Sequence, residues 1–91
     1  MAEFLIEAYL SKADEGAEKN DAQRLRWAAE QLMREGVRVR FLRSIFVPED
    51  ETCFYLYEAA SAEDVREAVR RAELPSAHVS EAVATPKEDE R

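Results

Sequence analysis

Acidic and phenolic side chains alternate with other residues in two short stretches of the sequence. Glu7 and Tyr9 lie two residues apart near the N-terminus, and Tyr55 and Tyr57 repeat this spacing in the middle of the chain. A carboxylate desolvated by aromatic neighbours gains proton affinity, and a nearby tyrosine or arginine can stabilise a developing anion. These four residues are therefore a candidate catalytic set for proton transfer on a small aromatic or enolic molecule without a cofactor. Tyrosines also pack in ordinary protein interfaces, and that alternative stays open.

A basic side chain could complete a ligand-binding site beside these residues. Arg40 or Arg43, in the stretch that precedes the second tyrosine pair, could reach the same space. The sequence does not decide which of the two arginines faces the site. The candidate ligand-binding residues are Glu7, Tyr9, Arg40, Arg43, Tyr55 and Tyr57.

Metal chemistry has few donors to draw on, because the chain contains one histidine and one cysteine. Nickel and zinc favour imidazole and thiolate ligands, but nothing in the spacing brings His78 and Cys53 together. A site could still form across a dimer axis, with His78 and Glu81 from each copy. A partly exposed histidine at a strand end is the more common situation. Only two glycines, Gly16 and Gly36, are present, so a glycine-rich phosphate loop is excluded.

The hydrophobic periodicity predicts the elements that must position these residues. Apolar residues at three- and four-residue steps indicate a helix at 21–35 and a second helix from Ser61 that Pro75 ends. Alternation indicates strands, although it blurs after Phe41, where either a bulge or burial of both faces is expected. The predicted strands span residues 3–10, 37–47, 52–59 and 78–83.

The resulting order, β-α-β-β-α-β, predicts an α+β protein with a ferredoxin-like fold. Two helices would cover one face of a four-stranded antiparallel sheet. Residues 1–83 form this domain, and residues 84–91 are expected to be a solvated C-terminal tail.

The alternation also predicts which face each side chain occupies. Phe4, Ile6, Phe54 and Leu56 are expected to face the helices, and Glu58 to share their side. The uncovered face would then carry mixed aromatic and aliphatic residues, which soluble monomers rarely leave exposed. We therefore expect a homodimer that packs sheet to sheet around a tyrosine-lined cavity. The residues expected on the uncovered face are Leu5, Glu7, Tyr9, Cys53, Tyr55 and Tyr57.

Composition excludes several classes of protein. Twenty acidic against thirteen basic residues give a net charge of −7, the wrong sign for a nonspecific nucleic-acid binder. No apolar run reaches the length of a membrane span, and no basic region followed by a long apolar stretch suggests a signal peptide. A single cysteine fits a reducing compartment, so a cytoplasmic location is expected.

The segment FLRSIFVPEDETCFYLYEA at residues 41–59, followed by Ser61 and a helix that closes on Pro75, resembles a small bacterial family of unknown function. This family is labelled nickel-binding after one member. The resemblance covers nearly all of residues 2–83 and is strongest over residues 40–65. It implies a ferredoxin-like fold, a dimeric α/β barrel and nickel as a candidate ligand. Nickel-binding members carry histidines where this chain has residues such as Val69 and Leu74, so the resemblance transfers no ligand set.

Three classes of function follow from these observations. The leading hypothesis is a dimeric protein that binds a small ligand or a divalent metal ion of the nickel type in the cavity between its sheets. The alternative is a cofactor-independent isomerase or cyclase that acts on a small organic molecule in the same cavity. A pure interaction module is the third, in which Trp27, on the outward side of the first helix, would anchor a second contact.

Overall fold

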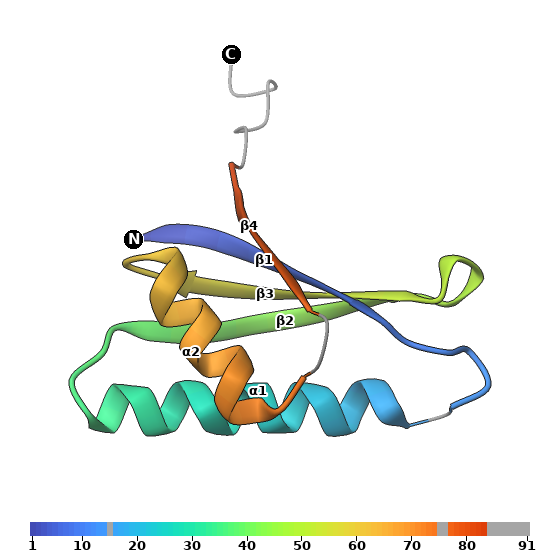
Figure 1. Ribbon diagram of the computed structural model, residues 1–91, viewed down its shortest axis with the longest axis horizontal. Coiled ribbons are helices and arrows are strands. Elements are labelled where there is room, and N and C mark those ends of the chain that lie inside the picture. The colour runs from blue at the N-terminus through green and yellow to red at the C-terminus, as the bar shows by residue number, and fades with distance from the viewer. Residues whose placement is uncertain (15, 75–76, 84–91) are drawn as a thin grey trace, which may run out of the picture.

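The elements of the structure, a computed structural model, follow the predicted order (Figure 1). The structure describes residues 1–14, 16–74 and 77–83, so the tail expected at 84–91 lies outside the described residues. A 3-10 turn, Pro48–Asp50, joins the second and third strands. The elements are β1 (Ala2–Tyr9), α1 (Ala17–Arg34), β2 (Val39–Val47), β3 (Thr52–Ala59), α2 (Ala62–Ala72) and β4 (His78–Ala82).

The four strands form one antiparallel sheet in the order β2-β3-β1-β4. Both helices lie on one side of this sheet, and no described helix lies on the other side (Figure 1). This arrangement confirms the predicted ferredoxin-like α+β fold. Within the described residues, it also leaves one whole face of the sheet without a covering layer.

The second strand contains the irregularity that its blurred alternation indicated. The pairing of β2 with β3 shifts between Phe41 and Arg43, so that Leu42 is an extra residue, as in a β-bulge. Before the bulge, Val39 is buried against the helices. Beyond it, Ser44 lies opposite the buried Tyr55 and therefore faces the helices too.

Helix α1 begins four residues before the start that the sequence predicted. Gly16, at a positive φ of 87°, precedes it and supplies a conformation that other residues adopt with difficulty. The added first turn is tied to the sheet, because the Ser44 hydroxyl donates a hydrogen bond of 2.9 Å to Glu18 Oε2. Gly36, at a φ of 91°, follows the helix as expected.

Helix α2 starts with the predicted cap. Ser61 Oγ accepts a hydrogen bond of 3.3 Å from the backbone N–H of Asp64, which satisfies one of the unpaired donors at the helix start. The buried stripe of α2 consists of Val65, Ala68, Val69 and Ala72.

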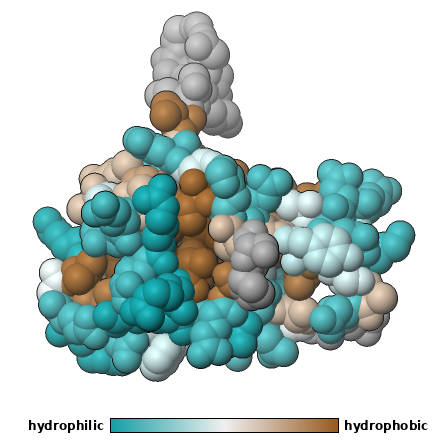
Figure 2. Space-filling model, viewed as in Figure 1, coloured by the Kyte–Doolittle hydropathy of each residue, from teal (hydrophilic) through white to brown (hydrophobic). Residues whose placement is uncertain are grey.

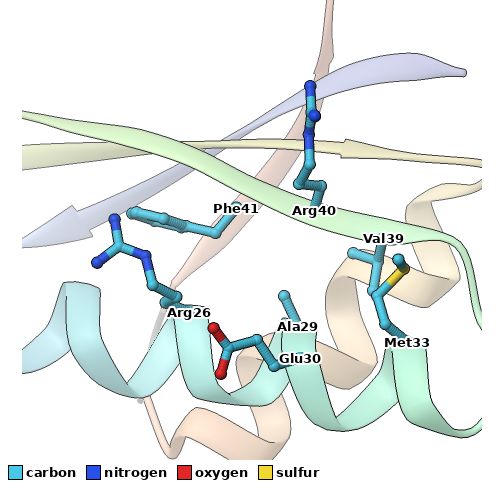
Figure 3. Close-up of a pocket in the computed structure, with 7 residues that line it drawn as sticks. All are labelled: Arg26, Ala29, Glu30, Met33, Val39, Arg40 and Phe41. Carbon is cyan, nitrogen blue, oxygen red and sulfur yellow. The ribbon is translucent and has the colours of Figure 1, made fainter.

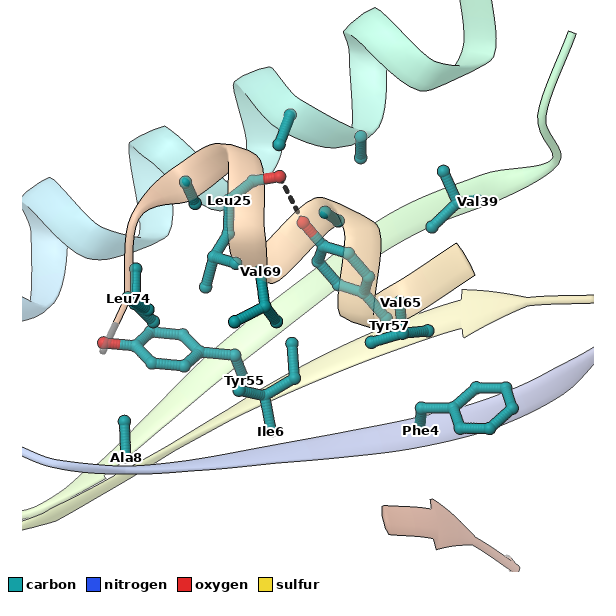
Figure 4. Close-up of a cluster of buried hydrophobic side chains, with 14 of the residues drawn as sticks. Phe4, Ile6, Ala8, Leu25, Val39, Tyr55, Tyr57, Val65, Val69 and Leu74 are labelled. Carbon is teal, nitrogen blue, oxygen red and sulfur yellow. Dashed lines mark hydrogen bonds between the residues drawn. The ribbon is translucent and has the colours of Figure 1, made fainter. Parts of the chain in front are cut away.

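The core lies between the helices and the inner face of the sheet, and it includes two tyrosines (Figure 4). Tyr55 pairs with Ile6 and Tyr57 with Phe4, so both rings point toward the helices. The Tyr57 hydroxyl donates to the Leu25 carbonyl of α1. The Tyr55 hydroxyl donates to Asp21 Oδ2 at 3.3 Å.

The predicted facing of β3 is therefore wrong. Cys53, Tyr55 and Tyr57 lie on the helix side and are fully buried, whereas Phe54 and Leu56 lie on the open side. Either set is apolar enough to be buried, so alternation alone does not choose between them. The tyrosines are long enough to span the gap to α1 and find acceptors there, which offsets the cost of burying a hydroxyl.

The surface around the helices is mostly hydrophilic. In the direction of Figure 1, apolar side chains reach the surface near the middle of the molecule, while hydrophilic side chains dominate the lower part, where α1 lies (Figure 2). Among the described residues, no helix is both long and apolar enough to cross a membrane.

Candidate ligand-binding face of the sheet

The side of the sheet away from the helices, called the open face below, carries the residues best placed to bind a ligand. Its composition follows from the strand register, because residues directly opposite each other in antiparallel strands share a face. Glu7 lies opposite Phe54 on one side and His78 on the other. The main residues of the open face are Leu5, Glu7, Tyr9, Arg40, Arg43, Ile45, Phe54, Leu56, Glu58 and His78.

The centre of the open face is apolar. Leu5 lies directly opposite Leu56, and Ile45 lies opposite Phe54. Ile45 is 43% exposed, which leaves part of this row in contact with water. The centre of this face therefore consists of aliphatic and phenylalanine side chains where Tyr55 and Tyr57 were expected. The predicted tyrosine-lined cavity is wrong in this respect.

One end of the open face is polar. Glu7 on β1 and His78 on β4 occupy directly opposed positions. Together with Tyr9 and Thr52 they line a shallow cavity of about 350 Å³. Tyr9 is 73% exposed, and its hydroxyl donates a 3.5 Å hydrogen bond to Glu51 Oε1. The fold thus unites two residues of the predicted ligand set with the histidine of the predicted metal set.

Glu81, the predicted metal partner of His78, does not join this group. It lies opposite Phe4, whose side chain faces the helices, whereas His78 lies opposite Glu7 on the open face. Three residues of separation along a regular strand place two side chains on opposite faces. The predicted pairing of His78 with Glu81 is therefore wrong.

Both candidate arginines lie on the open face, which the sequence left undecided. Arg40 and Arg43 are three residues apart, and the extra residue at Leu42 restores the phase between them. Arg40 Nη2 lies 3.2 Å from Glu58 Oε1. This ion pair also corrects the predicted position of Glu58, which is on the open face and not on the helix side.

Tyr55 and Tyr57 do not belong to this face, and their chemistry is that of core residues. Burial raises the pKa of each phenol well above its ordinary value, so both remain protonated hydrogen-bond donors. Burial likewise raises the pKa of the Cys53 thiol. A neutral, buried thiol is a poor nucleophile and a poor metal ligand.

The described part of one chain gathers too few donors at any point to hold a metal ion. Within residues 1–14, 16–74 and 77–83, no three histidine, cysteine or acidic side chains gather at one point. Glu7 and His78 provide one carboxylate and one imidazole. This donor set suits a divalent transition metal only if a second copy contributes equivalent residues.

Taken together, the fold and this face define a small ferredoxin-like α+β protein with an uncovered, partly apolar sheet surface that ends in a carboxylate–imidazole pair. A family model described as "Nickel responsive protein SCO4226-like" matches residues 4–82, so the chain belongs to this family. This match confirms the family that the resemblance indicated.

A solved structure shows the same fold. The crystal structure of SCO4226 from Streptomyces coelicolor A3(2) superposes with a TM-score of 0.70 and is 22% identical in sequence. The similarity covers 93% of this chain and 100% of that one. A search among curated proteins finds no match.

Sequence reasoning missed the pairing of Glu7 with His78, although a signal for it existed. In a ferredoxin-like sheet the fourth strand lies beside the first, so the histidine that starts β4 must approach the end of β1. The predicted topology already contained this neighbourhood. The sequence did not predict the apolar centre at Leu56 and Phe54, because these two residues of β3 were expected to face the helices.

Proposed function

We propose that this protein is a homodimer that binds a divalent metal ion of the nickel type, or a small ligand, between the open faces of two copies. The observation that carries the proposal is the juxtaposition of Glu7 and His78 on the uncovered side of the sheet. The description of its family as nickel responsive supports the choice of metal.

The dimer is supported by the apolar centre of the open face. Leu5 and Phe54 are half-buried and Ile45 is 43% exposed, whereas Leu56 beside them is already 9% exposed and packed among its neighbours. Burial of apolar surface stabilises association by roughly 25 cal/mol per Å² before the entropic cost is subtracted. A second copy of the same face would cover this centre in an isologous contact.

The metal site is supported by what two-fold symmetry would add. Each copy brings one imidazole and one carboxylate, so two copies placed about an axis near His78 would supply two of each. Imidazole nitrogen is a favoured ligand of nickel, and carboxylate oxygen is acceptable to it. The residues that would hold the ion are therefore His78 and Glu7, and their counterparts in the second copy.

The small-ligand version uses the same face. Its apolar centre would contact the body of a ligand, and Arg43, which lies opposite Leu56, would bind an acidic group. The enzyme alternative keeps only Glu7 and Tyr9 of its four candidate residues on this face, and no observation favours it.

We also propose a cytoplasmic location, since the single thiol needs no oxidising compartment.

Calorimetric titration with nickel chloride tests the metal site. The unaltered protein should bind nickel, and His78→Ala and Glu7→Gln should each weaken binding by at least about tenfold. Glu81→Gln is the matched control, because it removes a carboxylate from the same strand on the opposite face. Nickel binding that survives His78→Ala, or that is lost equally with Glu81→Gln, would contradict the site. Heat on titration with benzoate but not with nickel would favour the small-ligand version.

A further inference from the structure

The outer edge of β2 and the adjacent side of α1 form a second surface, separate from the open face. In the sheet order β2-β3-β1-β4, β2 is an edge strand of nine residues. Within the described part of the chain it pairs only with β3, so its outer backbone groups have no partner strand. Such an edge is a template for another extended chain.

A groove runs directly beside this edge (Figure 3). It has a volume of about 320 Å³ and lies between β2 and α1. Its apolar lining comes from Ala29, Val39 and Phe41, and Arg26 and Glu30 of α1 stand at its rim. The Arg26 guanidinium lies 5.0 Å from the centre of the Phe41 ring. That contact holds a positive charge at the mouth of the groove.

The groove continues toward the start of β2. A neighbouring cavity of about 220 Å³ shares Met33, Val39 and Arg40 with it and extends to Arg38, Met1 and Glu58, where it reaches the border of the open face. The two cavities therefore follow the strand together. Met33, which belongs to both, is 54% exposed, and its flexible thioether can adapt to an apolar side chain.

The charge of this region is opposite to that of the whole chain. Residues 22–47, which form most of α1 and all of β2, contain six arginines and only two glutamates, whereas the chain has a net charge of −7. Arg26 and Arg38 lie at the groove itself, and no ion pair is formed by either among the described residues. An acidic partner would be attracted to this region and repelled by most of the remaining surface.

We propose that this groove binds an extended, acidic segment of another protein, which adds as a strand to the edge of β2. Its backbone would pair with residues 38–41, before the bulge interrupts the register. Alternate side chains would enter the groove, and acidic ones would meet Arg26 and Arg38. A second copy of this chain fits less well, because it would bring two basic edges together; antiparallel self-pairing about Val39, for example, places Arg38 directly opposite Arg40.

This inference goes beyond the proposed function and does not depend on it. The main cavity between α1 and β2 lies on the helix side of the sheet edge, and only its continuation at Arg40 and Glu58 borders the open face. The proposed metal site at Glu7 and His78 uses other strands, β1 and β4. Failure of nickel binding would leave the groove unaffected.

The test is an amide chemical-shift titration of the full-length, ¹⁵N-labelled protein. The probe is an acetylated heptapeptide of sequence Asp-Val-Glu-Val-Asp-Val-Glu, and the control peptide has lysine at each acidic position. Shifts should appear at residues 38–41 and along the groove side of α1 with the acidic peptide only. The double variant Arg26→Glu, Arg38→Glu should weaken binding by at least about tenfold. The control is Arg66→Glu, which makes the same charge reversal at a single exposed arginine of α2. It should leave binding of the acidic peptide nearly unchanged.

Several results would overturn the proposal. No shifts at about 1 mM acidic peptide, or equal binding of the lysine peptide, would remove it. Shifts confined to the open face would assign the binding to the other surface. Shifts at β2 that grow with protein concentration in the absence of peptide would mean that a second copy occupies the edge.

Discussion

At the scale of single residues, the tyrosine hydroxyls show how the interior of this protein is specified. Tyr55 and Tyr57 look like cavity-lining residues in the sequence, but each spans the core and donates to α1. Phe54 and Leu56, which look like core residues, occupy the face without helices. The choice between the two phases depends on acceptors at Asp21 and at the Leu25 carbonyl, which are remote in sequence and become visible only in the folded chain.

Removal of the Tyr57 hydroxyl should destabilise the fold. Tyr57→Phe deletes a buried hydrogen bond and leaves the ring in place, so the free energy of unfolding should fall by about 1 kcal/mol. Urea denaturation at a fixed protein concentration measures this change. Tyr9→Phe is the matched control, because Tyr9 is exposed, and it should change the free energy of unfolding by less than about 0.5 kcal/mol. Equal effects of the two variants would contradict the assigned role of Tyr57.

At the scale of elements, the two helices are joined by a small network of charges. Arg71 of α2 makes two hydrogen bonds to the carboxylate of Glu35, just beyond α1, at 2.8 and 2.9 Å. The same guanidinium contacts Glu67 at 2.8 Å, one helical turn earlier in α2. Arg71 lowers the pKa of Glu35, while Arg70 and then Arg71 hold the pKa of Glu67 at about 2.

This network should make stability depend on pH in the acidic range. Because the carboxyl pKa values are lower in the folded state than in the unfolded chain, the contribution is complete above about pH 4.5. It should be lost as the pH falls toward 2, when the carboxylates become protonated. Arg71→Met should lower stability at pH 7 and reduce this acid-dependent loss, as measured by thermal melts from pH 2 to 7.

The network lies at the surface, with the Glu35, Glu67 and Arg71 side chains 48%, 32% and 21% exposed, so salt should screen the effect in part. In 1 M sodium chloride the difference between Arg71→Met and the unaltered protein should shrink. Glu30→Gln, which changes an exposed carboxylate of α1 outside the network, is the control and should leave the acid dependence unchanged. A difference that is constant across pH and salt would point to lost packing of the arginine stem instead.

The elements themselves were predictable, while their exact phases were not. Strand and helix order follows from periodicities that survive in a single sequence, and the Ser61 cap appeared at the expected place. The start of α1 could not be predicted, because its added first turn is held by Ser44, a partner on a distant strand. Of the candidate site, Glu7 and Tyr9 lie on the expected face, because β1 alternates clearly. The facing of Arg40 and Arg43 could not be predicted, because it depends on the bulge at Leu42.

At the scale of the whole molecule, two surfaces of different character lie on different sides of the sheet. The open face combines an apolar centre with a carboxylate–imidazole pair, and the β2 edge combines an unpaired strand with clustered arginines. The first suits another copy of this chain, and the second suits an acidic partner. A dimer formed through the open face would leave the cavity between α1 and β2 of each copy on the helix side of the sheet.

The dimer should depend on the apolar centre of the open face. Ile45→Asp puts a charge on the 43% exposed apolar side chain of this face and should raise the dimer dissociation constant by at least about thirtyfold. Light scattering over a range of micromolar concentrations measures the mass, and circular dichroism confirms that the variant is folded. Trp27 lies on the outer side of α1 and is 48% exposed, so Trp27→Ala should leave the mass unchanged. A monomeric unaltered protein, or a dimer lost only with Trp27→Ala, would contradict this arrangement.

The extra residue at Leu42 has a consequence for how this strand can vary during evolution. If Leu42 is left out, the side chains before and after it alternate between the two faces as in a regular strand. A chain that lost Leu42 would therefore straighten β2 without moving any other side chain to the opposite face. Deletion of a single codon usually inverts the faces of everything that follows it in a strand. Deletion of the Leu42 codon is different, because it would leave the residues on both faces of β2 where they are.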